Sequence, residues 1–140
     1  MSGFYYRIDR IKRGIWTAIL AAYTGAIFYA SVYPVGEGPS IVTFPGIDKI
    51  VHAGEFTLFA LICYRTIGYY TGREMRRLGL IAISVLVGGL TELVQLLFPY
   101  RTASFLDWFA DLAGVAIGLA LIIVIEKWKA KKERTNPDRA

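Results

Sequence analysis

A single cysteine and a small share of charged residues limit what this sequence can encode. Cys63 has no second cysteine to pair with, so a scaffold stabilised by internal disulfides is excluded. Charged residues make up 19% of the 140 positions and apolar residues 55%, a balance that excludes a disordered chain. The 5 prolines and 14 glycines are scattered and no internal repeat is present, so the chain is neither low-complexity nor a solenoid.

Four apolar runs account for most of the sequence, and they cover 15–33, 50–70, 78–98 and 105–125. Each is close to the length of about 20 residues that a helix needs to cross a hydrocarbon core about 30 Å thick. Basic residues precede the first run, as in a signal peptide, but the run is long for that role and lacks small residues at a cleavage position. The sequence therefore predicts an all-α integral membrane bundle of four transmembrane helices.

The positions of the basic residues predict the orientation of the bundle. Of the 16 lysines and arginines, only Lys49 and Arg101 fall on the connections that four spans would place on the outer side. Since cytoplasmic loops carry the excess of Lys and Arg, both termini are expected in the cytoplasm. The chain then divides into a cytoplasmic N-terminal segment (1–14), a transmembrane domain (15–125) and a basic cytoplasmic tail (126–140).

The basic balance also bears on the partners of the protein. Basic clusters directly beside apolar helices are what topology and anionic lipid headgroups demand, whereas a nucleic-acid binder needs its cations on one folded surface. We therefore expect the lipid bilayer as a partner and no nucleic acid.

Polar residues gather towards the outer ends of the predicted spans. A carboxylate near the centre of a membrane helix costs about 2.5 to 3.5 kcal/mol, so each one is a candidate functional residue. Asp48, His52 and Glu55 are spaced i, i+4, i+7 and line one stripe of the second span. The other polar candidates on this side are Glu92, Gln95, Arg101, Ser104, Asp107 and Asp111.

Some of these residues have a structural explanation in helix capping. Asp48 can cap the start of the second helix through its carboxylate. Ser104 and Asp107 have the spacing of a capping box, in which each side chain would accept a backbone N–H of the other residue. For these three residues, capping and function remain open alternatives.

Charge pairing is a second structural explanation. Glu55 can pair with His52 or Arg101, and Glu92 with Arg101, which would join helices without forming a site. Capping does not account for Glu92 or Asp111, which lie inside their spans, and for both we favour a function.

Small residues indicate where helices approach closely. Gly114 and Gly118 form a G-x-x-x-G pattern, and Asp111, Gly114 and Gly118 lie at i, i+3, i+7 on one helix face. The face that carries the acid is therefore also the predicted close-packing face.

The polar pattern as a whole reads Asp48-Lys49-x-x-His52-x-x-Glu55-Phe56, then Glu92-x-x-Gln95, then Arg101-x-x-Ser104-x-x-Asp107-x-x-x-Asp111-x-x-Gly114-x-x-x-Gly118. Over residues 48–118 it resembles the VanZ-like family of small polytopic membrane proteins. One departure is Asp111, where the family pattern usually has asparagine. The family takes its name from a member linked to resistance against glycopeptide antibiotics, so the resemblance implies a cell-envelope role in a prokaryotic plasma membrane. It implies no settled reaction.

The expected function is to bind or act on the polar head of a lipid or lipid-linked cell-envelope molecule at the outer leaflet. Arg101 offers a planar fork for a phosphate or carboxylate, and His52 with Glu92 is suited to acid–base work. The candidate catalytic residues are His52, Glu92 and Asp111. The candidate substrate-binding residues are Arg101, Asp48, Glu55, Gln95, Ser104 and Asp107.

Two other classes of function fit the same residues. A non-enzymatic transport, flipping or resistance accessory protein would use the buried acids as a proton or substrate path, and with only four helices it would need a homo-oligomer or a partner protein. A purely structural role would use the polar groups only to join helices. The carboxylates and the imidazole have the atoms of metal ligands, but their spacing matches no metal signature, so no metal or other cofactor is expected.

Overall fold

The computed structural model describes residues 2–34, 46–99, 101 and 104–135, and these residues are largely helical and contain no strand. The four helices are α1 (Ser2–Val32), α2 (Ile47–Ile67), α3 (Arg73–Gln95) and α4 (Phe105–Thr135). All four are long and apolar enough to cross a membrane. The predicted all-α bundle of four membrane-spanning helices is confirmed.

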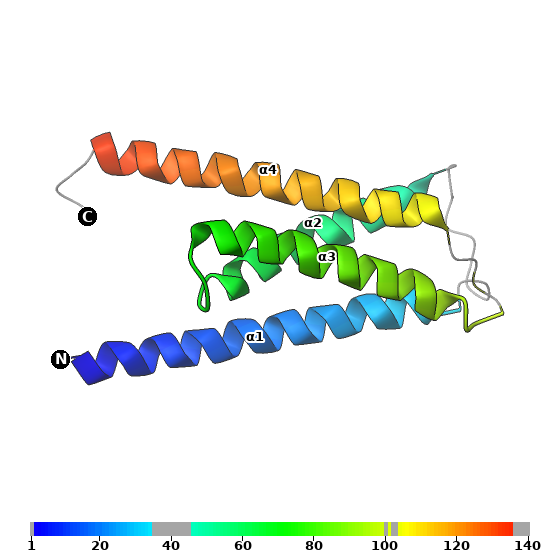
Figure 1. Ribbon diagram of the computed structural model, residues 1–140, viewed down its shortest axis with the longest axis horizontal. Helices are drawn as coiled ribbons and strands as arrows, with labels where there is room; N and C mark the ends of the chain where they lie inside the picture. Colours follow the sequence, from blue (N-terminus) through cyan, green and yellow to red (C-terminus); the bar gives the residue numbers. More distant parts are fainter. Residues whose placement is uncertain (1, 35–45, 100, 102–103, 136–140) are drawn as a thin grey trace.

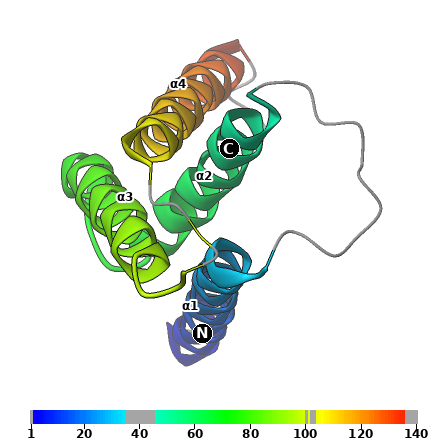
Figure 2. The same ribbon diagram turned by 90° about the vertical axis from the view of Figure 1, so that its right-hand side faces the viewer.

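The helices run alternately up and down, so α1 begins and α4 ends at the same end of the bundle (Figure 1). We call the opposite end, where α2 and α4 begin, the outer end, in keeping with the predicted orientation. α2 and α3 each contact the other three helices, whereas α1 and α4 do not contact each other along their described lengths (Figure 2). α2 and α4 therefore lie side by side and run in the same direction.

Two of the helices extend beyond the predicted spans. α1 and α4 have 31 residues each, a length of about 46 Å, which exceeds a hydrocarbon core of about 30 Å. The basic residues of segments 1–14 and 126–135 lie on these extensions. A helix can continue through charged residues once it has left the apolar phase, so these segments prolong the helices. Residues 136–140 of the predicted tail lie outside the described residues.

The shorter helices differ from their predicted spans at both ends. α2 begins at Ile47, directly after Gly46, whose φ of 88° is a left-handed conformation that favours glycine. It ends at Ile67 instead of continuing to residue 70. α3 covers Arg73–Gln95 instead of 78–98. Hydropathy locates the apolar part of a helix, whereas backbone hydrogen bonds set its ends.

The contact between α2 and α4 depends on two glycines of α4. A Cβ added at Gly114 would collide with the backbone carbonyl of Ala53, and one added at Gly118 would lie 2.6 Å from the Cβ of Ala60. The Thr57 hydroxyl lies 2.7 Å from the carbonyl oxygen of Ala53 and 3.0 Å from that of Gly114. The predicted close-packing face is therefore the face that α4 turns towards α2.

A polar contact centred on Glu126 also joins α2 and α4 at the end of the bundle nearest the termini. Glu126 of α4 accepts hydrogen bonds from the hydroxyl of Tyr64 on α2, at 2.5 Å, and from the guanidinium of Arg77 on α3, at 2.7 Å. Since α3 also takes part, this contact fixes three helices at one level.

The first prediction concerns orientation. Green fluorescent protein folds in the cytoplasm, and alkaline phosphatase is active only after export. We expect a fusion of the fluorescent protein after residue 140 to fluoresce, and a phosphatase fused at residue 100 to be active. The opposite pattern at both positions would contradict the predicted cytoplasmic termini.

The second prediction concerns the α2–α4 contact. Gly114→Ala places a methyl group against the Ala53 backbone, which cannot move aside as a flexible side chain can, and we expect it to lower the free energy of unfolding by about 2 kcal/mol. The measurement is a denaturant titration in detergent micelles. Gly25→Ala on α1 is the matched control, because its added Cβ has no neighbour within 4 Å. Equal stability of the two variants would refute the role of Gly114.

Candidate functional site

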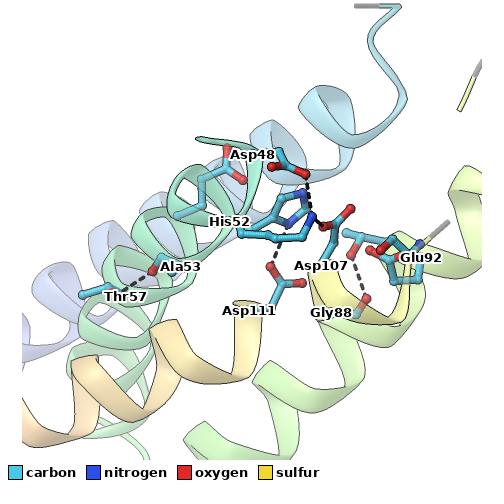
Figure 3. Close-up of polar contacts among 12 residues, drawn as sticks. Asp48, His52, Ala53, Thr57, Gly88, Glu92, Asp107 and Asp111 are labelled. Atoms are coloured by element: carbon cyan, nitrogen blue, oxygen red, sulfur yellow. Dashed lines mark hydrogen bonds and ion pairs between the residues drawn. The ribbon is translucent and has the colours of Figure 1, made fainter. Parts of the chain in front are cut away.

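Polar side chains from α2, α3 and α4 meet at the outer end of the bundle, and Figure 3 shows that those it labels near this end lie close together. We define the polar cluster as Asp48, Lys49, His52, Glu92, Ser104, Asp107 and Asp111. Its members come from the start of α2, the last turns of α3 and the start of α4. Six of the nine polar candidates from the sequence therefore lie in this cluster, whereas Glu55, Gln95 and Arg101 do not.

His52 and Asp111 form the most buried pair of the cluster. The Nδ1 atom of His52 lies 2.8 Å from Oδ1 of Asp111, and the Asp111 side chain is 1% exposed (Figure 3). When Asp111 is ionised its carboxylate only accepts hydrogen bonds, so Nδ1 then carries the proton and Nε2 is the ring nitrogen free to exchange a proton with a ligand. A histidine oriented by a carboxylate in this way is an arrangement that serves as a general base.

Lys49 joins α2 to α4 one turn closer to the outer end. Its Nζ atom lies 2.6 Å from Oδ2 of Asp48 and 2.8 Å from Oδ1 of Asp107. The Asp107 side chain is 14% exposed and that of Asp48 is 55% exposed. Lys49 therefore neutralises a largely buried acid on the neighbouring helix.

Glu92 of α3 binds the start of α4. Its Oε2 atom accepts the backbone N–H of Ser104 at 2.7 Å, and the Ser104 carbonyl oxygen accepts the N–H of Asp107 at 2.9 Å. In a capping box the Ser104 N–H would be bound by the Asp107 side chain, and the Asp107 N–H by the Ser104 hydroxyl. The capping-box alternative is wrong, since the carboxylate that caps Ser104 comes from another helix and Asp107 binds Lys49.

Three predicted site residues lie apart from these contacts. The Nε atom of Arg101 donates to the carbonyl oxygen of Ser31 at 2.8 Å, which ties the end of α1 to the connection between α3 and α4. Among the described residues Arg101 forms no ion pair, so the suggested pairing with Glu55 or Glu92 is not present. The Glu55 carbonyl accepts the Tyr23 hydroxyl, while Gln95 is buried near the end of α3.

A groove of about 610 Å³ between α3 and α4 adjoins the polar cluster. Its walls are mostly apolar side chains, including Leu86, Leu90, Leu93 and Phe105. Gly89 contributes no side chain and so leaves space in the wall. Since these residues belong to membrane-spanning helices, the groove is suited to an apolar chain.

The polar end of this groove carries side-chain atoms without partners. Glu92, Ser104 and Trp108 line it. Three buried atoms close to this end have no hydrogen-bond partner among the described residues, namely Oε1 of Glu92, Nε1 of Trp108 and Oδ2 of Asp111. Buried polar atoms are rarely left unpaired in folded proteins, so these three atoms are candidates for contacts with a ligand or water.

Sequence reasoning missed Lys49 and Trp108 as members of the site. Lys49 was assigned only to topology, although its place beside Asp48 in the polar pattern is a usable signal. Trp108 follows Asp107 at the start of α4 and was not selected, because tryptophan is common at membrane interfaces for reasons unrelated to function.

The described side chains do not bring three or more metal-binding groups of the His, Cys, Asp and Glu types close enough to hold a metal ion. What the site presents instead is a set of hydrogen-bonding atoms at the end of an apolar groove.

Comparison with known proteins identifies the family of the chain. The VanZ/LLP1 family profile matches residues 8–126, which is most of the sequence. No curated protein and no solved structure matches significantly. The chain belongs to the VanZ/LLP1 family, and it has four helices able to span a membrane.

The third prediction tests the lysine bridge. Lys49→Met leaves the largely buried Asp107 without a cation, and we expect a clear fall in the free energy of unfolding, measured by denaturant titration in detergent. Asp48→Asn removes a charge from the same bridge at an exposed position, so we expect a much smaller fall. Equal losses in the two variants would show that burial of Asp107 does not set the strength of this contact.

Proposed function

We propose that this VanZ/LLP1-family membrane protein binds the polar head of a lipid or lipid-linked cell-envelope molecule in its polar cluster. The apolar chain of that molecule lies in the groove between α3 and α4. Under the predicted orientation, the head is taken from the outer leaflet of a prokaryotic plasma membrane.

The observation that carries this proposal is the continuity of the groove with the cluster. One hollow has apolar walls formed by residues such as Leu86 and Leu93, and it is also lined by Glu92, Ser104 and Trp108. A lipid has the same division into an apolar chain and a polar head. A water-soluble ligand would gain little from the apolar walls, because they face the hydrocarbon region.

The cluster also has groups able to act on a bound head. His52 is held by Asp111 through Nδ1, and this contact orients the imidazole for proton exchange through Nε2. Glu92 lies at the boundary between the groove and the cluster. These residues support binding of the head. They also support proton transfer to or from the bound head as a reaction that the site could catalyse.

The family resemblance supports a link to the cell envelope. Glycopeptide antibiotics act outside the membrane at the cell wall, which is the side on which the predicted orientation places the cluster. Binding of a lipid-linked envelope molecule is a function through which a protein of this family would affect such resistance.

The fourth prediction tests occupancy of the groove. Native mass spectrometry of the protein purified in mild detergent is expected to detect a retained lipid. Gly89→Leu fills space in the groove wall, and Glu92→Gln replaces one carboxylate oxygen by an NH₂ group. We expect each substitution to lower the lipid-bound fraction about tenfold, since each removes part of the fit to the chain or the head.

Gly25→Leu is the matched control for the larger side chain, because a Cβ at Gly25 has no neighbour within 4 Å and the residue lies on α1, away from the groove. Its lipid-bound fraction should equal that of the unmodified protein. Retention of lipid by Gly89→Leu at the control level would refute binding in the groove.

A further inference from the structure

Three buried side-chain atoms on the facing parts of α3 and α4 have no hydrogen-bond partner among the described residues. Two are carboxylate oxygens, Oε1 of Glu92 and Oδ2 of Asp111, and the third is the indole nitrogen Nε1 of Trp108. The backbone of Gly88 approaches this place, since a Cβ there would lie 3.2 Å from Oδ2 of Asp111 and 3.2 Å from Cδ1 of Trp108. Asp111 is among the most completely buried side chains of the bundle.

The types of these atoms define what would pair with them. Ionised carboxylate oxygens accept hydrogen bonds, and an indole N–H only donates. An ammonium group donates but does not accept, and a phosphate dianion accepts but does not donate. A hydroxyl group does both, so hydroxyls can satisfy all three atoms.

Building on the proposed function, we propose that the polar cluster recognises its lipid through hydroxyl groups of the head. The ligand class is a lipid whose head is a sugar or a glycerol, with hydroxyls bound by Glu92, Asp111 and Trp108. Carboxylates accept two hydroxyls readily, and an aromatic ring beside them supplies an apolar face for a sugar.

The charges of the cluster argue against an anionic head at the same place. With its four carboxylates ionised, against one lysine and one histidine, the cluster is negative even when His52 is protonated. Lys49 is shared by two of those carboxylates. The nearest arginine by sequence, Arg101, donates through Nε to the Ser31 carbonyl at the end of α1. A phosphate placed against Glu92 and Asp111 would meet repulsion from both.

Trp108 also connects the proposed binding site for hydroxyls, formed with Glu92 and Asp111, to the groove. It lines the groove together with Glu92, whereas Asp111 lies behind it on the side of His52. A head bound here remains attached to a chain that lies along Leu90 and Leu93. The site therefore selects by head chemistry at one end of a groove that accepts apolar chains generally.

The fifth prediction compares lipids that share the same acyl chains and differ only in the head. Delipidated protein in detergent is titrated with glucosyldiacylglycerol, phosphatidylglycerol, phosphatidylethanolamine and phosphatidic acid, and the bound fraction is measured by native mass spectrometry. We expect glucosyldiacylglycerol to have a dissociation constant about tenfold lower than phosphatidylethanolamine and phosphatidic acid, a difference typical of one or two hydrogen bonds. Phosphatidylglycerol is expected to bind more tightly than phosphatidic acid, because it adds hydroxyls to the same phosphate.

The indole N–H provides a variant with a matched control. Trp108→Phe keeps an aromatic ring but removes the donor, and it should reduce the preference for the glucosyl head over phosphatidic acid to about threefold. Trp128→Phe makes the same change at an exposed position near the other end of α4 and should leave the tenfold preference intact. Elution of both variants as single species establishes that they fold.

The outcomes separate the two proposals. Equal binding of all four lipids would overturn hydroxyl recognition and leave lipid binding in place, whereas failure of all four to bind would refute the proposed function and this inference with it. Tightest binding of phosphatidic acid or phosphatidylethanolamine would assign the site to anions or to ammonium groups and overturn the proposal. If phosphatidylglycerol and the glucosyl lipid have equal dissociation constants, the site recognises hydroxyl groups in general. If phosphatidylglycerol binds more weakly, the site recognises a sugar.

Discussion

The close, parallel contact between α2 and α4 is the constraint on which the rest of the structure depends. It is made possible by Gly114 and Gly118, where the absence of a Cβ lets the backbone of α4 approach that of α2. Contacts then follow in one register along both helices, from Lys49 with Asp107 at the outer end to Tyr64 with Glu126 at the other. If α4 shifted by one helical turn along α2, the ion pair of Lys49 and the hydrogen bond of Tyr64 would break together. The glycine contact and the polar contacts therefore specify the same register.

This register explains how carboxylates persist inside membrane helices. An acid in the apolar phase is costly unless a partner lies within hydrogen-bond distance. The α2 helix supplies those partners, with Lys49 for Asp107 and His52 for Asp111. The other face of α4 turns towards α3, where Glu92 binds the start of α4 through a backbone N–H. Glu92 and Asp111, which join helices in this way, each keep a second oxygen without a partner, which is why structural and proposed binding roles coincide in these two residues.

The sequence predicted the members of this site more accurately than their partners. The i, i+4 spacing of Asp107 and Asp111 shows that they share a face of α4, but it does not show which helix that face meets. Spacing therefore leaves capping as an equal alternative for Asp107, and it leaves pairing with Arg101 as one alternative for Glu92. In the structure Asp107 and Asp111 are each bound by a residue of α2, and Arg101 binds the end of α1. Spacing describes one helix at a time, whereas partners depend on how two helices are packed.

Hydropathy and charge in the sequence determined that the chain forms four membrane-spanning helices, because the thickness of the bilayer sets the length of an apolar run whatever the tertiary packing. The small-residue pattern also determined the close-packing face of α4. Only the tertiary structure decided that α2 is the helix meeting this face, that His52 pairs with Asp111, and that a groove lined by Glu92 and Trp108 adjoins them. The reason is that a groove and its unpartnered atoms exist only between helices, where distances are set by packing in three dimensions.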